Sequence, residues 1–71
     1  MTNTALLNQQ IDMKGLKKSY IAEQMGISTV CLRNKISGST EFKISEVLRL
    51  QDILGLNDDL TRDIFLSQDV N

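Results

Sequence analysis

The stretch KSYIAEQMGISTVCLRNKISG, residues 18–38, carries the clearest structural pattern of the sequence. Gly26 separates two segments of helical spacing, and Ala22 lies four residues before it, where a small side chain allows close packing. The apolar residues around this pair are Ile21, Met25, Ile27 and Leu32. The second segment is otherwise mostly polar, so its outward face has little to bury. The pattern predicts two short helices joined by a tight turn.

Glycines divide the rest of the chain into segments in the same way. Four glycines lie between segments of helical spacing and none lies inside one: Gly15, Gly26, Gly38 and Gly55. We therefore expect five helices, at about residues 4–14, 18–25, 28–36, 44–54 and 57–66. The expected N-caps are Thr4, Ser28 and Asn57. The predicted fold is all-α, a compact five-helix bundle, with residues 1–71 as a single domain and a loose tail at about 67–71.

The bulk composition favours a small helical protein of the cytoplasm. The chain has 71 residues, of which 41% are apolar and none is proline, which suits a compact helical domain better than a disordered one. No apolar run approaches the roughly 20 residues of a membrane span. The start, MTNTALLNQQ, lacks the basic and apolar regions of a signal peptide. Cys31 is the only cysteine and histidine is absent, so we expect no disulfide, no zinc or other metal, and no cofactor.

Charge is distributed unevenly along the sequence. The formal net charge is −1, but residues 14–43 carry six lysines and arginines against two glutamates, a balance of +4. Residues 44–71 carry two arginines against six acidic residues, a balance of −4. Either the first part forms a basic binding surface, or the unevenness is the chance of a short chain.

Over residues 16–56 the sequence resembles the lambda-repressor/Cro class of helix-turn-helix proteins, and in particular their short phage-encoded regulators. The similar segments are GLKKSYIAEQMGIS, TVCLRNKISG and EFKISEVLRLQDILGL. They resemble the family's helix 2 with its turn, its recognition helix, and its linker with helix 4. Ala22, Gly26 and Leu32 occupy the family's signature core positions. The resemblance implies a helix-turn-helix core at residues 18–38 and a location in the cytoplasm of a bacterial host cell.

Lys17 and Lys43 depart from the family pattern. The family usually has threonine or serine at the cap of helix 2, and its phage subgroup often has threonine at the cap of helix 4. A lysine at a cap forgoes about 1 kcal/mol of capping energy and places a cation at the positive end of the helix dipole. Either these lysines give up cap stability for contact with DNA phosphates, or the two helices begin with frayed turns.

The predicted third helix presents five side chains within about 140° of arc. They are Thr29, Val30, Arg33, Asn34 and Ser37. Arg33 can donate to guanine O6 and N7, and Asn34 can pair with adenine N6 and N7. Thr29 and Val30 offer methyl groups to thymine. We expect these four to contact bases of double-stranded DNA; the alternative is that they are exposed residues without a role.

Further residues are expected at the DNA backbone. Lys18 lies where the family has a residue that touches phosphate, and the loop after the third helix offers hydroxyls, amides and a cation. The backbone-contacting set is Lys17, Lys18, Ser28, Ser37, Ser39, Thr40 and Lys43. Ideal helix geometry turns Lys35 toward the interior, so we do not count it among the base-contacting residues. It would extend its ammonium to solvent or neutralise the helix C-terminus.

Two functions fit these patterns. The first is a sequence-specific DNA-binding transcriptional regulator of phage Cro or repressor type, which inserts the third helix (about 28–36) into the major groove of an operator. Because one such module has a small interface, we expect a homodimer at least on DNA. Ile64, Phe65 and Leu66 would form its dimer or partner surface, or else close the core over the fourth helix.

The second function is a protein-binding modulator, such as an antirepressor, that keeps the helix-turn-helix fold and binds a helix-turn-helix repressor. The acidic second half and a pI near 5.1 favour this function over that of a protein that binds DNA tightly. The sequence offers no acid–base or nucleophile constellation, so we expect no enzyme.

Overall fold

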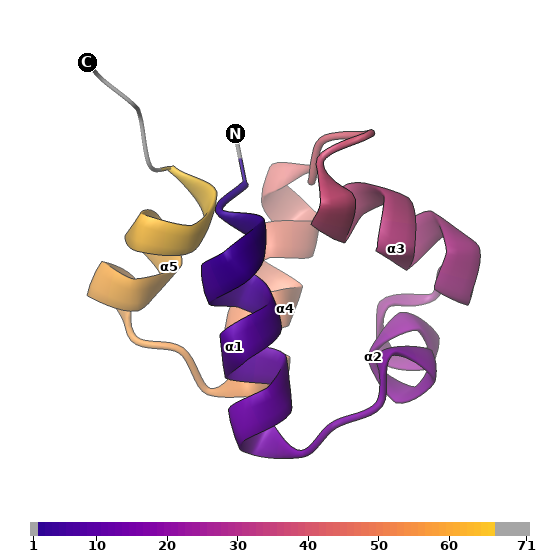
Figure 1. The fold of residues 1–71 in the computed structure, drawn as a ribbon, viewed down its shortest axis with the longest axis horizontal. Helices are drawn as coiled ribbons and strands as arrows, with labels where there is room; N and C mark the ends of the chain where they lie inside the picture. The colour runs from indigo at the N-terminus through magenta and orange to yellow at the C-terminus, as the bar shows by residue number, and fades with distance from the viewer. Residues whose placement is uncertain (1, 67–71) are drawn as a thin grey trace.

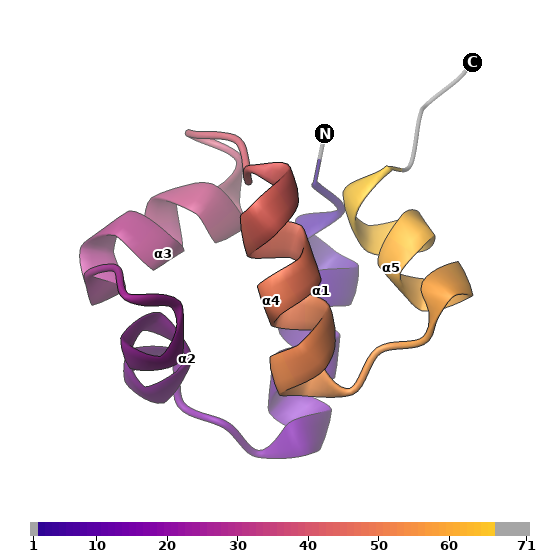
Figure 2. The same cartoon turned by 180° about the vertical axis from the view of Figure 1, so that it is seen from behind.

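The computed structural model describes residues 2–66, which contain five α-helices and no strand. The helices are α1 (Thr4–Lys14), α2 (Lys18–Met25), α3 (Thr29–Ser37), α4 (Ile44–Leu54) and α5 (Asp58–Phe65). Figure 1 and Figure 2 show α1 and α4 in the middle, with α2 and α3 on one side and α5 on the other. The predicted all-helical, compact fold is confirmed for this part of the chain. The predicted loose tail at about 67–71 lies outside the described residues.

Side-chain caps fix where α3 and α5 begin. Ser28 Oγ accepts a hydrogen bond from the N–H of Cys31 at 3.0 Å. Asn57 Oδ1 accepts one from the N–H of Leu60 at 2.7 Å. Each bond satisfies an N–H group that the first turn of a helix leaves without an intrahelical partner. Both residues are therefore the caps that the sequence predicts.

The predicted cap of α1 is wrong by one residue. Asn3 is the cap, and its Oδ1 accepts a hydrogen bond from the N–H of Leu6 at 3.1 Å. Thr4 is the first helical residue, and its hydroxyl donates to the carbonyl oxygen of Ile36 at 2.6 Å. That carbonyl lies in the last turn of α3, where no intrahelical N–H reaches it. The Thr4 hydroxyl thus joins the start of α1 to the end of α3.

Gly26 makes the turn between α2 and α3. Its φ is +73°, in the left-handed region where a side chain costs about 1–2 kcal/mol. Its N–H donates to the carbonyl of Glu23 at 3.1 Å, and the N–H of Ile27 donates to that of Ala22 at 3.0 Å. These bonds satisfy the last carbonyls of α2. The chain can therefore reverse at once and pack α3 against α2.

The core lies where the helices meet. The largest side chains with almost no exposure are Leu7, Ile21, Leu32, Leu50, Leu54 and Ile64. Phe42, in the loop before α4, packs edge-on against Phe65 with ring centroids 5.3 Å apart and planes at 82°. Such a pair contributes about 0.5–1.5 kcal/mol beyond its buried area. It joins the α3–α4 loop to the end of α5.

Two of the three residues expected at a partner surface belong to the core. Ile64 is fully buried and Phe65 is 6% exposed. Helical spacing turns both toward α1 and α4, against which α5 packs. The carbonyl of Ile64 also accepts a hydrogen bond from the N–H of Asn3 at 2.6 Å. Only Leu66, at 56% exposure, lies on the surface, so Ile64 and Phe65 follow the alternative expectation, in which they close the core over the fourth helix.

Two features are missing from residues 2–66. No helix there combines the length and the apolar character that crossing a membrane requires. The same residues contain no cluster of three or more cysteine and carboxylate side chains placed to hold a metal ion.

Candidate nucleic-acid interface

The outer face of α3 is open to solvent along its length. Val30 is 64% exposed, and Arg33, Asn34 and Ser37 are exposed as well. Thr29 is half-buried at the start of the helix. The opposite face of α3 packs into the core through Leu32, Lys35 and Ile36. All four residues predicted to contact bases therefore lie on one face that the fold leaves uncovered or partly covered.

The start of α2 lies next to the end of α3. Lys18, Arg33 and Ser37 line one surface cavity of about 220 Å³, together with Thr4, Asn8 and Ile36. The two cations in this lining give the cavity a positive potential. The fold thus brings together three residues that the sequence predicts at DNA and that lie up to nineteen positions apart.

Asn8 is a residue of this cavity that the sequence does not single out. Its Oδ1 is buried and has no hydrogen-bond partner among the described residues. A buried polar atom without a partner is costly, so it favours a bound water or ligand group at that point. The one feature of the sequence that indicates this position of Asn8 is its i, i+4 spacing from Thr4, which sets both side chains on one face of α1.

Lys17 is exposed and stands at the N-cap of α2 without a side-chain cap hydrogen bond. Replacing Lys17 with threonine is expected to raise the free energy of unfolding by about 1 kcal/mol, because the hydroxyl can accept from the first turn of α2. Urea denaturation followed by circular dichroism measures this change. The phosphate-contact hypothesis adds weaker DNA binding with a smaller salt dependence; unchanged DNA binding contradicts it.

The loop between α3 and α4 is held by short-range hydrogen bonds. The Ser37 hydroxyl donates to the carbonyl of Asn34 at 3.1 Å and is hydrogen-bonded to the Ser39 hydroxyl at 3.2 Å. The N–H of Thr40 donates to the same Asn34 carbonyl at 3.2 Å. Ser37, Ser39 and Thr40 are exposed. Three of the four hydroxyl residues predicted to contact the DNA backbone therefore lie in one hydrogen-bonded segment at the end of α3, and the fourth, Ser28, caps the start of the same helix.

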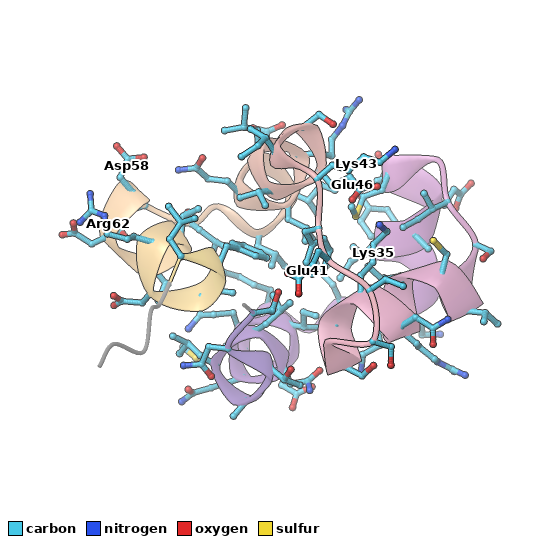
Figure 3. All side chains as sticks on the ribbon, turned by 90° about the horizontal axis from the view of Figure 1, so that it is seen from above. Lys35, Glu41, Lys43, Glu46, Asp58 and Arg62 are labelled. Carbon is cyan, nitrogen blue, oxygen red and sulfur yellow. The ribbon has the colours of Figure 1, made fainter. Side chains whose placement is uncertain are left out.

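Lys35 is buried in an ion pair that local sequence does not reveal. It is 7% exposed, and its Nζ lies 3.1 Å from Glu46 Oε1, in the first turn of α4. The ammonium also donates to the carbonyl of Glu41 at 3.2 Å. Figure 3 shows the pair between α3 and α4. The expected extension of the side chain to solvent is therefore wrong, because Glu46 draws the ammonium toward α4, whereas the position of Lys35 in the last turn of α3 agrees with the expectation of a cation near that helix C-terminus.

Glu46 also supplies the cap that Lys43 cannot. The N–H of Lys43 donates to Glu46 Oε1 at 2.8 Å. A lysine ammonium has no acceptor, so only the glutamate half of a capping box is formed at α4. This bond leaves the Lys43 side chain free for the surface, where it is exposed. This hydrogen bond to Glu46, the third residue of α4, therefore argues against the frayed first turn considered for this helix.

Two interactions hold the pKa of the Glu46 carboxyl below its ordinary value of 4.5. Burial alone would raise this pKa, but the hydrogen bond from the Lys43 N–H and the Lys35 ammonium outweigh that effect. A carboxylate with a lowered folded-state pKa stabilises the fold above its unfolded pKa. That stabilisation is lost as the pH falls through the folded-state pKa.

We therefore expect a wild-type stability that falls between about pH 6 and pH 3 more steeply than that of the Glu46→Gln variant. Glutamine keeps an acceptor for the Lys43 N–H but does not titrate. Urea denaturation at a series of pH values measures the difference. Parallel pH profiles for the two proteins contradict this role of the ion pair.

Comparisons with family models, with curated proteins and with solved structures give no match to this chain.

Proposed function

We propose that this chain is a sequence-specific DNA-binding regulator in which α2 and α3 form a helix-turn-helix and α3 enters the major groove. The observation that carries the proposal is the outer face of α3. This face is largely exposed, and it presents Arg33 and Asn34, whose side chains can form bidentate bonds to guanine and adenine. Val30, with 64% of its surface exposed, adds an apolar contact for a thymine methyl.

The surroundings of α3 support the proposal. Lys18 shares a cavity with Arg33 at one side of the helix. The loop hydroxyls continue from the end of the helix, and Lys43 follows them at the start of α4. Cations and hydroxyls bordering a base-reading face are suited to DNA phosphates, which position a protein on the duplex. The acidic residues of α4 and α5 are not part of α2 or α3, the two helices proposed to contact DNA.

A salt series of binding measurements tests the proposal. The probe is duplex DNA from the region upstream of the gene for this chain, with a scrambled duplex of the same composition as control. Lys17, Lys18 and Lys43 are the cations proposed to contact phosphate in each copy. We expect the logarithm of the binding constant to fall with the logarithm of salt at a slope of about −3 per copy. Equal binding to both duplexes, or no binding, overturns the proposal.

One observation favours the second function, a protein-binding modulator. The exposed surface of α4 and α5 is rich in carboxylates, namely Asp52, Asp58, Asp59 and Asp63. Such a surface can attract a basic protein and steer its association. If the chain binds neither duplex alone but forms a stoichiometric complex with a second helix-turn-helix protein from the same gene neighbourhood, the modulator function is the correct one.

A further inference from the structure

The surface cavity where α1, α2 and α3 meet contains an acceptor without a donor. The cavity has a volume of about 220 Å³, and its lining includes Asn8 of α1, Lys18 of α2 and Arg33 of α3. Within residues 2–66, Asn8 Oδ1 is the one buried side-chain oxygen or nitrogen that has no hydrogen-bond partner. Because a buried carbonyl oxygen without a partner is costly, this position requires a donor.

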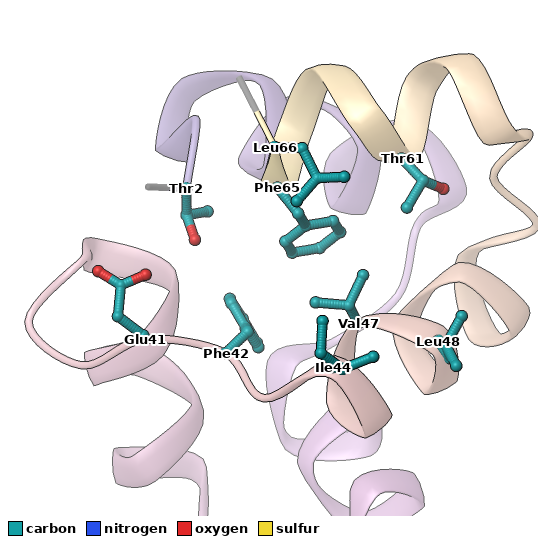
Figure 4. A pocket seen from close by; sticks show the side chains of 9 residues that line it. All are labelled: Thr2, Glu41, Phe42, Ile44, Val47, Leu48, Thr61, Phe65 and Leu66. Atoms are coloured by element: carbon teal, nitrogen blue, oxygen red, sulfur yellow. The ribbon is translucent and has the colours of Figure 1, made fainter. Parts of the chain in front are cut away.

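The apolar hollow between the start of α4 and the end of α5, shown in Figure 4, differs in this respect. Its walls are mostly apolar, with Phe42, Val47 and Phe65 among them. Its Thr61 hydroxyl already donates to the carbonyl of Asn57 at 2.8 Å. In the described part of the chain, an unmet polar requirement in a cavity lining is therefore found at Asn8 and not in this hollow.

Two side chains of the Asn8 cavity still have free donors. The hydroxyls of Thr4 and Ser37 are occupied, since each donates to a backbone carbonyl of α3, at 2.6 and 3.1 Å respectively. The side chains of Lys18 and Arg33, by contrast, form no hydrogen bond or ion pair with another residue in the range 2–66. The donor for Asn8 Oδ1 within the protein is therefore one of these two cations.

We propose that the Arg33 guanidinium donates to Asn8 Oδ1, and that this bond positions Arg33 to read a guanine. Arginine has N–H donors on every nitrogen of its guanidinium. A bidentate pair with guanine uses only one edge of that group, so the remaining donors can bond to Asn8 at the same time. Asn8 is then a positioning residue, which acts on the base through Arg33. The base-reading part of this inference rests on the proposed function.

The guanidinium of Arg33 suits this acceptor better than the ammonium of Lys18. A guanidinium is more weakly hydrated than an ammonium, so it loses less hydration when it approaches a buried oxygen. Because Arg33 has no partner among residues 2–66, its side chain can turn toward Asn8 without breaking a contact. Holding this long side chain in one geometry before DNA arrives also reduces the conformational entropy that is lost on binding.

Nuclear magnetic resonance of the free protein, with ¹⁵N in the arginine side chains, tests the bond. In the wild type we expect separate Arg33 Nη–H signals at low temperature, because the bond to Asn8 slows rotation of the guanidinium. Asn8→Leu has a similar size but no acceptor, and it should merge these signals. Asn8→Asp keeps an oxygen acceptor and should preserve them. Arg49, exposed on α4, is the control and should be alike in all three proteins. Circular dichroism confirms that the variants fold.

Competition between the bound duplex and its single-base variants tests the positioning role. Asn8→Leu is expected to lower the preference for the guanine that Arg33 reads by about threefold to thirtyfold, a part of what the whole arginine–guanine pair provides. Asn8→Asp should retain the preference. In an Arg33→Ala background Asn8→Leu should have no further effect, and in a Lys18→Ala background it should have its full effect. A merely structural role of Asn8 would lower binding to all duplexes equally.

The proposal is overturned if Asn8→Leu leaves the Arg33 signals unchanged, or if its effect on base preference persists in the Arg33→Ala background. Because the free-protein measurement uses no DNA, it separates this inference from the proposed function. If the Arg33 signals depend on Asn8 but the wild type binds no duplex selectively, the regulator fails and the bond stands. Selective binding with Arg33 signals that do not depend on Asn8 keeps the regulator and removes the bond.

Discussion

Replacing Lys35 with alanine is expected to lower the free energy of unfolding by about 2–4 kcal/mol. The substitution removes the 3.1 Å ion pair with Glu46 and the 3.2 Å bond to the Glu41 carbonyl. It leaves a carboxylate whose side chain is 15% exposed without its cation. The lower end of the range allows for the Lys43 N–H that Glu46 keeps. Urea denaturation measures the change.

This loss is large for a chain of 71 residues, whose total stability is about 4–10 kcal/mol at the usual 0.05–0.15 kcal/mol per residue. Lys14→Ala is the matched control, because Lys14 is exposed, and it is expected to change stability by less than about 0.5 kcal/mol. Lys35→Met keeps most of the volume. In the Lys35→Met/Glu46→Gln protein the two losses should not add, because neither charge is then left unpaired. Additive losses would show that packing, not the ion pair, accounts for the effect.

The helices were predictable because their signals are local. Gly26 and the other interhelical glycines stand at the ends of segments, and Ser28 and Asn57 each bond to an N–H three residues on. Bonds of this kind need no knowledge of the rest of the chain. The exposed face of α3 was predictable for the same reason, since helical spacing alone separates Arg33 and Asn34 from Leu32.

The interactions that the sequence did not reveal join residues far apart in the chain. The Thr4 hydroxyl bonds to a carbonyl thirty-two residues away, and this tertiary bond shifts the cap of α1 to Asn3. The partner of Lys35 lies eleven residues away, across a loop. The spacing of Lys43 and Glu46 is that of a capping box and was a readable signal for one Glu46 contact. Nothing local indicated that the same carboxylate also pairs with Lys35.

These long-range contacts converge on the segment that continues α3. Lys35 ties the last turns of α3 to the first turn of α4 through Glu46 and also holds the Glu41 carbonyl. The segment between them carries Ser39 and Thr40, two of the hydroxyls proposed to contact the DNA backbone. A buried ion pair is weak evidence for stability alone, but it can fix one arrangement of the elements that it joins. In this fold it would fix where α3 lies relative to those hydroxyls.

Replacing Arg33 with alanine is expected to weaken binding to the operator about fivefold to 150-fold for each half-site, the equivalent of about 1–3 kcal/mol. Arg33 is exposed in the middle of the outer face of α3, so its loss leaves the core intact. The guanidinium can form two parallel bonds to one guanine, and alanine can form none. Binding to operators with a substituted base should therefore fall much less, and a competition assay with single-base variants measures the difference.

The Arg33→Lys variant separates the recognition of a base by Arg33 from the effect of its positive charge. Lysine keeps the cation but not the planar pair of donors, so we expect most of the specificity to be lost while the salt dependence stays. Arg49→Ala is the matched control, since Arg49 is an exposed arginine on α4, outside the proposed contact set, and it should bind the operator as the wild type does. If Arg33→Ala and Arg49→Ala weaken binding equally, the arginines act only through net charge. In that case α3 does not read the sequence of the DNA.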